Sequence, residues 1–167
     1  MICCYFTHIH YKEEATAVEL EYLKRLYRDG LFDLYESFGT WQEAVKASVS
    51  PFLRAGMVEP GYADSILDNV AENGPYIFRA PHICMPHSKA VELVHAPGVC
   101  FVKVNQPVYY DRNDPDTGAE LFFAIAAQEL NAHLDAVMSL ADVFDDEETI
   151  QALLDAKTPQ DFETLLG

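Results

Sequence analysis

The chain has 167 residues, which is enough for one domain with its own hydrophobic core. Asp and Glu number 27 against 11 Lys and Arg, and the resulting net charge of −16 argues against nucleic acid or an anionic membrane as a partner. No apolar run approaches the roughly 20 residues of a membrane helix, and the polar start does not look like a secretory signal. With four cysteines that fit reduced thiols better than disulfides, we expect a cytoplasmic protein without membrane insertion.

The N-terminal part of the chain has two features of its own. Two cysteines and two histidines could bind a metal, although adjacent cysteines lack the usual loop spacing of a zinc site: Cys3, Cys4, His8 and His10. From residue 13 to 28, apolar side chains recur at helical spacing, and Gly30 supplies a stop. We expect a helix there that packs on the domain.

The next segments alternate between a strand and helices. Residues 31–37 predict a short strand, and the capping box from Thr40 to Glu43 predicts a helix start. Pro51 should kink or interrupt this helix before Gly56 ends it. A second helix should open at Pro60 and stop at the sequence Asn-Gly-Pro of residues 73–75.

The middle of the chain is typical of strands. Residues 76–80, 99–104 and 121–126 are short, apolar and partly β-branched or aromatic. Residues 111–118 contain Asp, Asn, Pro and Gly and predict a loop.

The chain closes with three predicted helices. Asn131 should cap the first, and four residues should form its core face: Leu134, Val137, Met138 and Ala141. The second should begin near Asp145, and the third at Thr158 and Pro159. Because helices and strands mix without strict βαβ alternation, we expect an α/β sandwich with a mixed sheet.

His87 is the most suggestive histidine for chemistry. Pro86 forces the preceding residue to be extended, so His87 should follow a strand on a tight loop where it is exposed yet held rigidly. Ser88 adds a hydroxyl and Lys89 a cation beside it. A neutral imidazole is a good nucleophile near pH 7, because one nitrogen can attack while the other donates a hydrogen bond. The alternative is a polar surface histidine.

His133 falls within the predicted first turn of a helix. A neutral histidine there could donate a hydrogen bond to a phosphate, since a helix N-terminus attracts anions. A half-exposed helix residue is an equally good interpretation. A zinc site made of four histidines stays open as a hypothesis, although their spacing is irregular: His82, His87, His95 and His133.

Several motifs in order resemble the enzyme IIA domains of the sugar phosphotransferase system. They are Asn69-Val-Ala-Glu-Asn-Gly-Pro-Tyr76, Ala80-Pro81, Met85-Pro-His-Ser88, Leu121-Phe-Phe-Ala-Ile-Ala-Ala127 and Asn131-Ala-His133-Leu. Within that group the chain looks most like the ascorbate branch of the mannitol/fructose class. The likeness covers roughly residues 33–166, so we divide the chain into an N-terminal extension over 1–30, helical from about residue 13, and an enzyme IIA domain over 31–167.

The resemblance implies a three-layer α/β fold with a mixed sheet flanked by helices. It implies that His87 accepts a phosphoryl group from a histidine-containing phosphocarrier protein and passes it to enzyme IIB. His133 would support that group, with Ser88 and Lys89 beside it as binding residues. No cofactor and no metal is then expected, and the extension could tune docking or form a homodimer.

Three positions depart from the family pattern. His82 stands where relatives usually have a small residue, often Gly, and Lys89 stands where many have Arg. Mannitol-type members carry Arg where this chain has Asn69. A lysine is a point charge, whereas a guanidinium binds phosphate with a fork of donors, so rate and partner choice could change.

Two other functions compete with sugar transport. A regulatory enzyme IIA-like protein would control partner proteins through its phosphorylation state, and it would keep the same histidine. A metal-dependent enzyme would require zinc on the four histidines.

Overall fold

The computed structural model describes the backbone of residues 20–167, and the side chains within that range except those of residues 130–134, 139 and 142. Residues 20–28 are helical. The other elements follow in chain order: β1 (Phe32–Tyr35), α2 (Trp41–Ser48), α3 (Ser50–Arg54), α4 (Tyr62–Asn73), β2 (Phe78–Ala80), β3 (His82–Cys84), η1 (Val91–Leu93), β4 (Gly98–Tyr109), η2 (Pro115–Thr117), β5 (Gly118–Ala126), α5 (Leu130–Asp145), α6 (Glu147–Asp155) and α7 (Pro159–Leu166).

The five strands form one mixed sheet in the order β1-β4-β5-β3-β2. β1 is parallel to β4 and β3 is parallel to β5, whereas the pairs β4–β5 and β2–β3 are antiparallel. The predicted α/β fold with a mixed sheet is therefore confirmed. The sequence prediction missed β3, because three residues directly before Met85 and Pro86 are too short to show a period.

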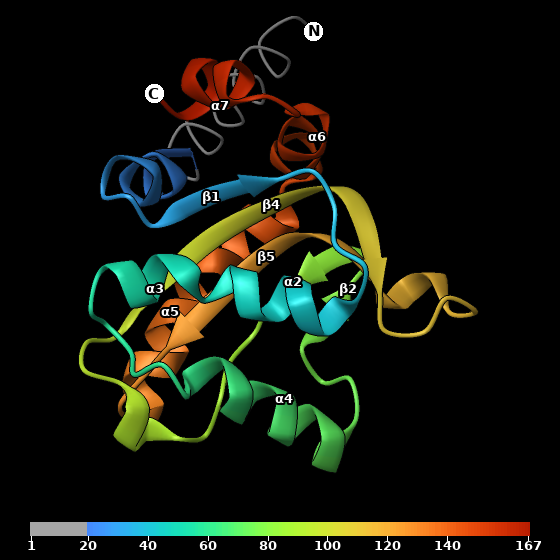
Figure 1. Ribbon diagram of the computed structural model, residues 1–167. Coiled ribbons are helices and arrows are strands. Elements are labelled where there is room, and N and C mark those ends of the chain that lie inside the picture. Colours follow the sequence, from blue (N-terminus) through green and yellow to red (C-terminus); the bar gives the residue numbers. More distant parts are fainter. Residues whose placement is uncertain (1–19) are drawn as a thin grey trace, which may run out of the picture.

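Helices cover both faces of the sheet, which gives three layers. In Figure 1, α2 and α3 lie in front of the sheet and α5 lies behind it. The front helices and α4 bury Phe52, Tyr62 and Ile66 against one face. On the other face the helix over 20–28 and the last three helices form a second core, in which Phe101 stacks on Phe123 with ring centroids 4.7 Å apart. Each face of the sheet thus has its own hydrophobic layer.

The predicted helix starts and stops are largely confirmed. Glu43 N donates to Thr40 Oγ1 at 3.3 Å and Thr40 N donates to Glu43 Oε2 at 3.1 Å, which completes the capping box. Pro51 lies in the first turn of α3 and separates it from α2. Gly74 ends α4 with a positive φ of 77°. A second capping box, at Thr158, starts α7.

The predicted core face of α5 is wrong in part. Met138 is 70% exposed and Ala141 is exposed, whereas Leu140 and Val143 are fully buried. The helix also begins at Leu130, with residue 129 as its N-cap, so the predicted cap at Asn131 is wrong as well. The predicted apolar face was rotated from the observed one, because α5 packs against a sheet whose position the helix's own sequence does not contain.

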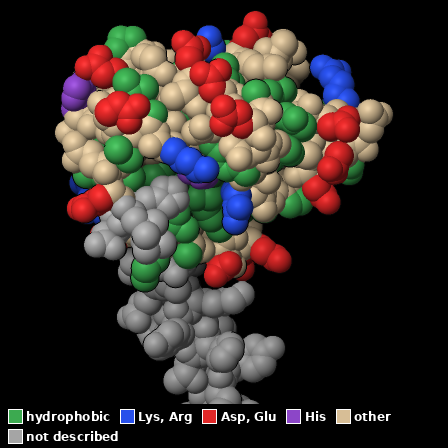
Figure 2. Space-filling model, turned by 90° about the horizontal axis from the view of Figure 1, so that it is seen from below, with side chains coloured by type: hydrophobic (Ala, Val, Ile, Leu, Met, Phe, Trp, Pro, Cys, Tyr) green, Lys and Arg blue, Asp and Glu red, His purple; other side chains and the backbone are tan. Residues whose placement is uncertain are grey.

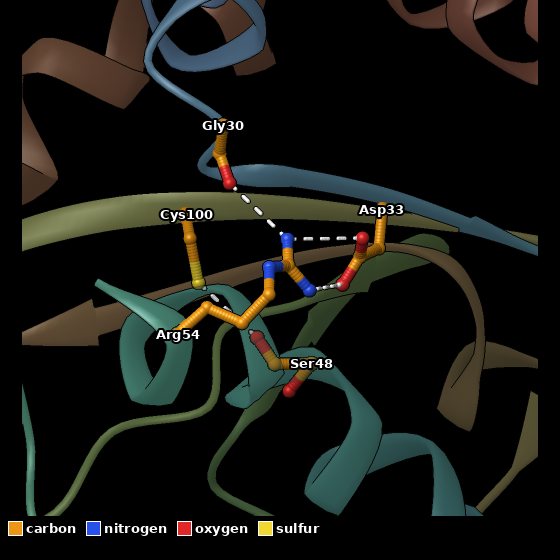
Figure 3. Close-up of polar contacts among 5 residues, drawn as sticks. All are labelled: Gly30, Asp33, Ser48, Arg54 and Cys100. Carbon is orange, nitrogen blue, oxygen red and sulfur yellow. Dashed lines mark hydrogen bonds and ion pairs between the residues drawn. The ribbon is translucent and has the colours of Figure 1, made fainter. Parts of the chain in front are cut away.

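The helix over 20–28 packs on the domain, as expected. Leu23 and Leu26 are buried in the second core, and Gly30 follows with a positive φ of 72°. Just after it, the Arg54 guanidinium donates to Asp33 at 2.7 and 3.1 Å and to the Gly30 carbonyl at 3.2 Å (Figure 3). Arg54 thereby joins α3 to β1 and to the turn before it. Residues 13–19 of the predicted helix lie outside the described residues, and the division of the chain at residue 30 stays a prediction.

A β-bulge interrupts the edge strand β2. Phe78 pairs with Cys84 and Ala80 pairs with Ile83, so Arg79 is an extra residue with no partner in the ladder. Bulges of this kind turn a side chain away from the regular alternation and are frequent beside active sites.

Candidate active site

His87 lies on a segment that is fastened to strands on both sides. Met85 N donates to Ile77 O at 2.7 Å, and Ile125 N donates to Pro86 O at 2.9 Å. Met85 and Pro86 are buried, whereas His87 is half-buried. The chain therefore continues from β3 as a rigid extended segment and delivers His87 to the surface at its end, as predicted for this histidine.

The orientation of the His87 ring follows from one hydrogen bond. Nδ1 lies 2.7 Å from the carbonyl oxygen of Met85. Because a carbonyl oxygen only accepts, Nδ1 must carry the proton, and in the neutral ring Nε2 carries the lone pair. The Tyr76 ring contacts the imidazole edge-on at a centroid distance of 4.9 Å, and its hydroxyl donates to His87 O at 2.7 Å. These contacts hold both the tautomer and the tilt of the ring.

Ser88 is the centre of a small polar network. Its Oγ lies 2.8 Å from Ser65 Oγ and accepts from Asn69 Nδ2 and from Ala90 N, both at 3.1 Å. Ser65 Oγ donates in turn to the Tyr62 carbonyl at 2.7 Å, so the Ser88 hydroxyl is left to donate to Ser65. The network fixes the backbone directly after His87.

Tyr62 links this loop to the sheet. Its buried hydroxyl donates to Ile125 O at 2.6 Å and accepts from Ser88 N at 3.3 Å. Burial raises the pKa of the Tyr62 phenol to about 12, so the group stays protonated and can donate throughout the physiological range. Helix α4 and strand β5 are thereby both connected to the segment that carries His87.

A cavity of about 590 Å³ opens beside the imidazole. Its walls come from β2, the segment of β3 and α5, and they are mostly apolar: Arg79, Ala80, Ile83, Met85, His87, Val137, Ala141, Phe144 and Asp145. Figure 2 shows a face on which Lys and Arg side chains and a His side chain group beside hydrophobic ones. One arginine and one aspartate are the charged residues in the described lining.

Comparison with known proteins gives this arrangement a family. The family model described as "Phosphoenolpyruvate-dependent sugar phosphotransferase system, EIIA 2" matches residues 25–167. The chain belongs to this enzyme IIA family. It is therefore a phosphoryl carrier of the sugar phosphotransferase system, and the family resemblance drawn from the motifs is confirmed.

Individual relatives agree with the family model. The ascorbate-specific EIIA component of Escherichia coli K12 is 36% identical over 123 residues, which cover 73% of this chain and 79% of that protein. A crystal structure of a IIA protein from Streptococcus mutans superposes with a TM-score of 0.72 at 25% identity, covering 85% of this chain and 90% of the other. The mannitol IIA of E. coli gives 0.69 at 27% identity in its crystal structure, covering 84% and 97%. In a complex with phosphorylated IIB it gives 0.66 at 26%, covering 81% and 97%.

The backbone at His82 fits the small residue that the family resemblance leads us to expect at this position. Its φ of 72° lies in the left-handed region, which glycine adopts without cost and a side chain adopts with strain. The imidazole does not line the cavity; its Nδ1 lies 3.0 Å from Glu120 Oε2 on β5. The departure at His82 therefore adds a surface pair with Glu120 rather than bulk in the cavity.

The other predicted residues take different places. Lys89 is exposed, two residues beyond His87. The backbone of α5 places position 133 one turn before Val137 of the cavity wall, but the His133 side chain lies outside the described residues. His95 pairs at 2.7 Å with Glu59, away from the cavity lining.

The metal hypotheses receive no support from the described part of the chain. Within it, no group of three or more His, Cys, Asp or Glu side chains is placed to hold a metal ion. His82 and His95 pair with different carboxylates, Glu120 and Glu59. The four N-terminal candidates lie outside the described residues: Cys3, Cys4, His8 and His10.

Cys84 and Cys100 are buried free thiols, and burial raises the pKa of both. No helix in residues 20–167 is long and apolar enough to cross a membrane.

Sequence reasoning missed two charged residues of the cavity, Arg79 and Asp145, and the tyrosines that hold the loop. Arg79 did leave a signal, because it is the one Lys or Arg between Arg54 and Lys89 in the sequence. Its place beside His87 could not be deduced from that, since it depends on a bulge and on the packing of α5.

Proposed function

We propose that His87 is the phosphoryl acceptor of this enzyme IIA and that Nε2 is the atom that becomes phosphorylated. The hydrogen bond from Nδ1 to the Met85 carbonyl carries this proposal, because it leaves the lone pair on Nε2 in the neutral ring. The rigid segment around His87 supports it, since phosphoryl transfer depends mainly on positioning and charge stabilisation.

The proposed donor is a histidine-containing phosphocarrier protein. The Nε2 lone pair of His87 forms a bond to phosphorus while the bond from phosphorus to the carrier's histidine breaks, and its electron pair returns to that nitrogen. The Nδ1 proton stays on His87. Positive charge that develops on the ring then lies next to the Met85 carbonyl oxygen, which stabilises it.

The proposed acceptor is a cysteine thiolate of an enzyme IIB. The sulfur attacks the same phosphorus, and the electron pair of the N–P bond returns to Nε2 of His87. The mannitol IIA of E. coli, which has the same fold, has been solved in complex with phosphorylated IIB. Because curated relatives are named ascorbate-specific components, we propose ascorbate as the sugar and the cytoplasm as the place of transfer. These names do not favour the regulatory alternative.

We assign supporting roles to the neighbours of His87. His133 is proposed to bind the phosphoryl group from α5, and Lys89 to attract it from the exposed side. The Ser88 hydroxyl is engaged with Ser65, Asn69 and Ala90, so its contribution to binding would come through the position of the loop. The segment over 1–30 stays a proposed extension that tunes docking or supports a homodimer.

Intact mass after incubation with phosphoenolpyruvate, enzyme I and the phosphocarrier protein tests the assignment. We expect an acid-labile gain of one phosphoryl group that is lost in His87→Ala and retained in His95→Ala, whose histidine pairs with Glu59 outside the cavity lining. A phosphorylated His87→Ala protein would refute the site. His133→Ala should keep the fold by circular dichroism and accept the group more slowly.

A further inference from the structure

We propose that Arg79 binds the phosphoryl group carried by His87, as a residue of the transfer site that family motifs do not indicate. This inference rests on the proposed role of His87. It concerns a different residue on a different strand, so the two can fail separately.

The first observation is the bulge in β2. Arg79 is the extra residue between the pairs Phe78–Cys84 and Ala80–Ile83. Phe78 packs with the core on the front face, together with Trp41 and Tyr110. The inserted residue instead reaches the opposite face, where its side chain lines the same cavity as His87. In a regular strand Arg79 alone would face the side opposite Phe78, whereas with the bulge both Arg79 and Ala80 line the cavity.

The second observation is that the positive charge of Arg79 has no side-chain partner among the described residues. The guanidinium of Arg79 makes no ion pair or hydrogen bond with any side chain in the described part of the structure, although Asp145 lines the same cavity. The cavity wall is mostly apolar, and an anion that entered it would lose water. Arg79 is exposed at the edge of this wall, so its unpaired guanidinium is accessible to a ligand that carries negative charge.

The chemistry of arginine matches the group that His87 would carry. A guanidinium presents a planar fork of donors that fits two oxygens of a phosphoryl group at once. Negative charge on those oxygens persists through the transfer, while the chain as a whole has an excess of 16 negative charges and Asp145 adds one beside the site. Arg79 offsets this repulsion where the phosphorus must be positioned for in-line attack.

The rate of phosphoryl acceptance from the phosphocarrier protein provides the test, with Arg112→Ala as the matched control. Arg112 lies exposed in the loop after β4 and outside the cavity lining, so its removal changes the net charge by the same amount. We expect Arg79→Ala to lower the rate by on the order of 100-fold, Arg79→Lys to recover part of it, and Arg112→Ala to match the unchanged chain. Added guanidinium ion should speed Arg79→Ala, because the cavity can admit it.

Each outcome has a separate meaning. If His87→Ala gains no phosphoryl group while Arg79→Ala reacts as fast as Arg112→Ala, the inference about Arg79 is wrong and the carrier function stands. If His87→Ala is phosphorylated, the carrier assignment itself fails. A slow Arg79→Ala protein that guanidinium does not rescue, with an unfolding midpoint below that of Arg112→Ala, would show a structural role and also overturn the proposal. In the phosphorylated proteins, the ³¹P resonance should shift between Arg79→Ala and the unchanged chain but not with Arg112→Ala.

Discussion

Arg54 and Arg79 are both exposed arginines near the edges of the sheet, but only Arg54 forms an ion pair among the described residues. The Arg54 guanidinium is bound by both carboxylate oxygens of Asp33 and by the Gly30 carbonyl (Figure 3). Arg79 lines the cavity beside His87 and has no such partner among the described residues. A cation paired within the fold thus contributes to stability, whereas a cation beside a nucleophile is available to a ligand.

The largest expected effect comes from reversing the two charges in turn. Arg79→Glu should reduce phosphoryl acceptance by on the order of 1,000-fold or more, because it places two carboxylates in the cavity with the incoming phosphoryl group. Arg54→Glu should weaken the fold but leave the rate per folded molecule within a few-fold. Stopped or quenched time courses, corrected for the folded fraction by circular dichroism, measure both. Equal losses of rate in the two variants would contradict the comparison.

Removal of Arg54 should affect stability and spare the transfer. Arg54→Ala leaves the partly buried Asp33 carboxylate without its bidentate donor and detaches α3 from the turn at Gly30. Since the arginine side chain is itself half exposed, we expect a loss of about 1–2 kcal/mol in the free energy of unfolding. Urea titration followed by circular dichroism measures it, with Arg79→Ala as the counterpart that should unfold near the urea concentration of the unchanged chain.

Lys103 differs from Arg54 and Arg79 because its side chain is buried within the fold. Lys103 on β4 is fully buried, and its Nζ donates to the Val104 carbonyl at 3.0 Å. Burial, helped by the nearby Lys157 and opposed by the carboxylates of Glu120 and Glu36, lowers the pKa of its ammonium group to about 8.

The sign of the resulting pH dependence follows from the lowered pKa. The charged form of Lys103 is favoured in the unfolded chain, so its contribution to the free energy of unfolding should be most unfavourable below about pH 8 and should rise by about 1–2 kcal/mol as the pH approaches 10. The buried thiols of Cys84 and Cys100, whose pKa values are raised, act in the opposite direction, so the contribution of Lys103 is read as the difference between the unchanged chain and Lys103→Met. Lys103→Met should flatten this rise. Urea titrations of both proteins at pH 7 and pH 9.5 give the difference, and identical slopes would contradict the assignment.

The smallest expected effect comes from removing the Tyr62 hydroxyl, which anchors the loop after His87. Tyr62→Phe removes the hydroxyl that donates to Ile125 O and accepts from Ser88 N. We expect a loss of about 1 kcal/mol in unfolding free energy and a several-fold slower phosphoryl acceptance, because the loop after His87 loses one anchor. Tyr35→Phe, whose tyrosine lies on β1 far from the cavity lining, is the matched control and should accept the group at the unchanged rate.

Local sequence signals predicted much of the fold. The capping box at Thr40, the helix start at Thr158 and the break at Pro51 set helix boundaries through contacts a few residues long, and the structure places them as expected. The apolar strands were found by their composition. Met138 was predicted to be buried and is exposed, and strand β3 was not predicted at all. Both errors arise because the buried face of a helix and the pairing of a three-residue strand depend on neighbours that are distant in the sequence.

The candidate site divides in the same way. Pro86 beside His87 is enough to predict an exposed, rigid histidine, because proline restricts the residue before it. The sequence by itself thus determined the family, the boundaries of helices that have a local cap or break, and the candidate nucleophile. Only the tertiary structure decided which His87 nitrogen carries the lone pair, that Ser88 is held by α4, and that Arg79 shares the cavity. Each of these depends on atoms from separate elements meeting in space, and residue spacing along one chain does not record such distances.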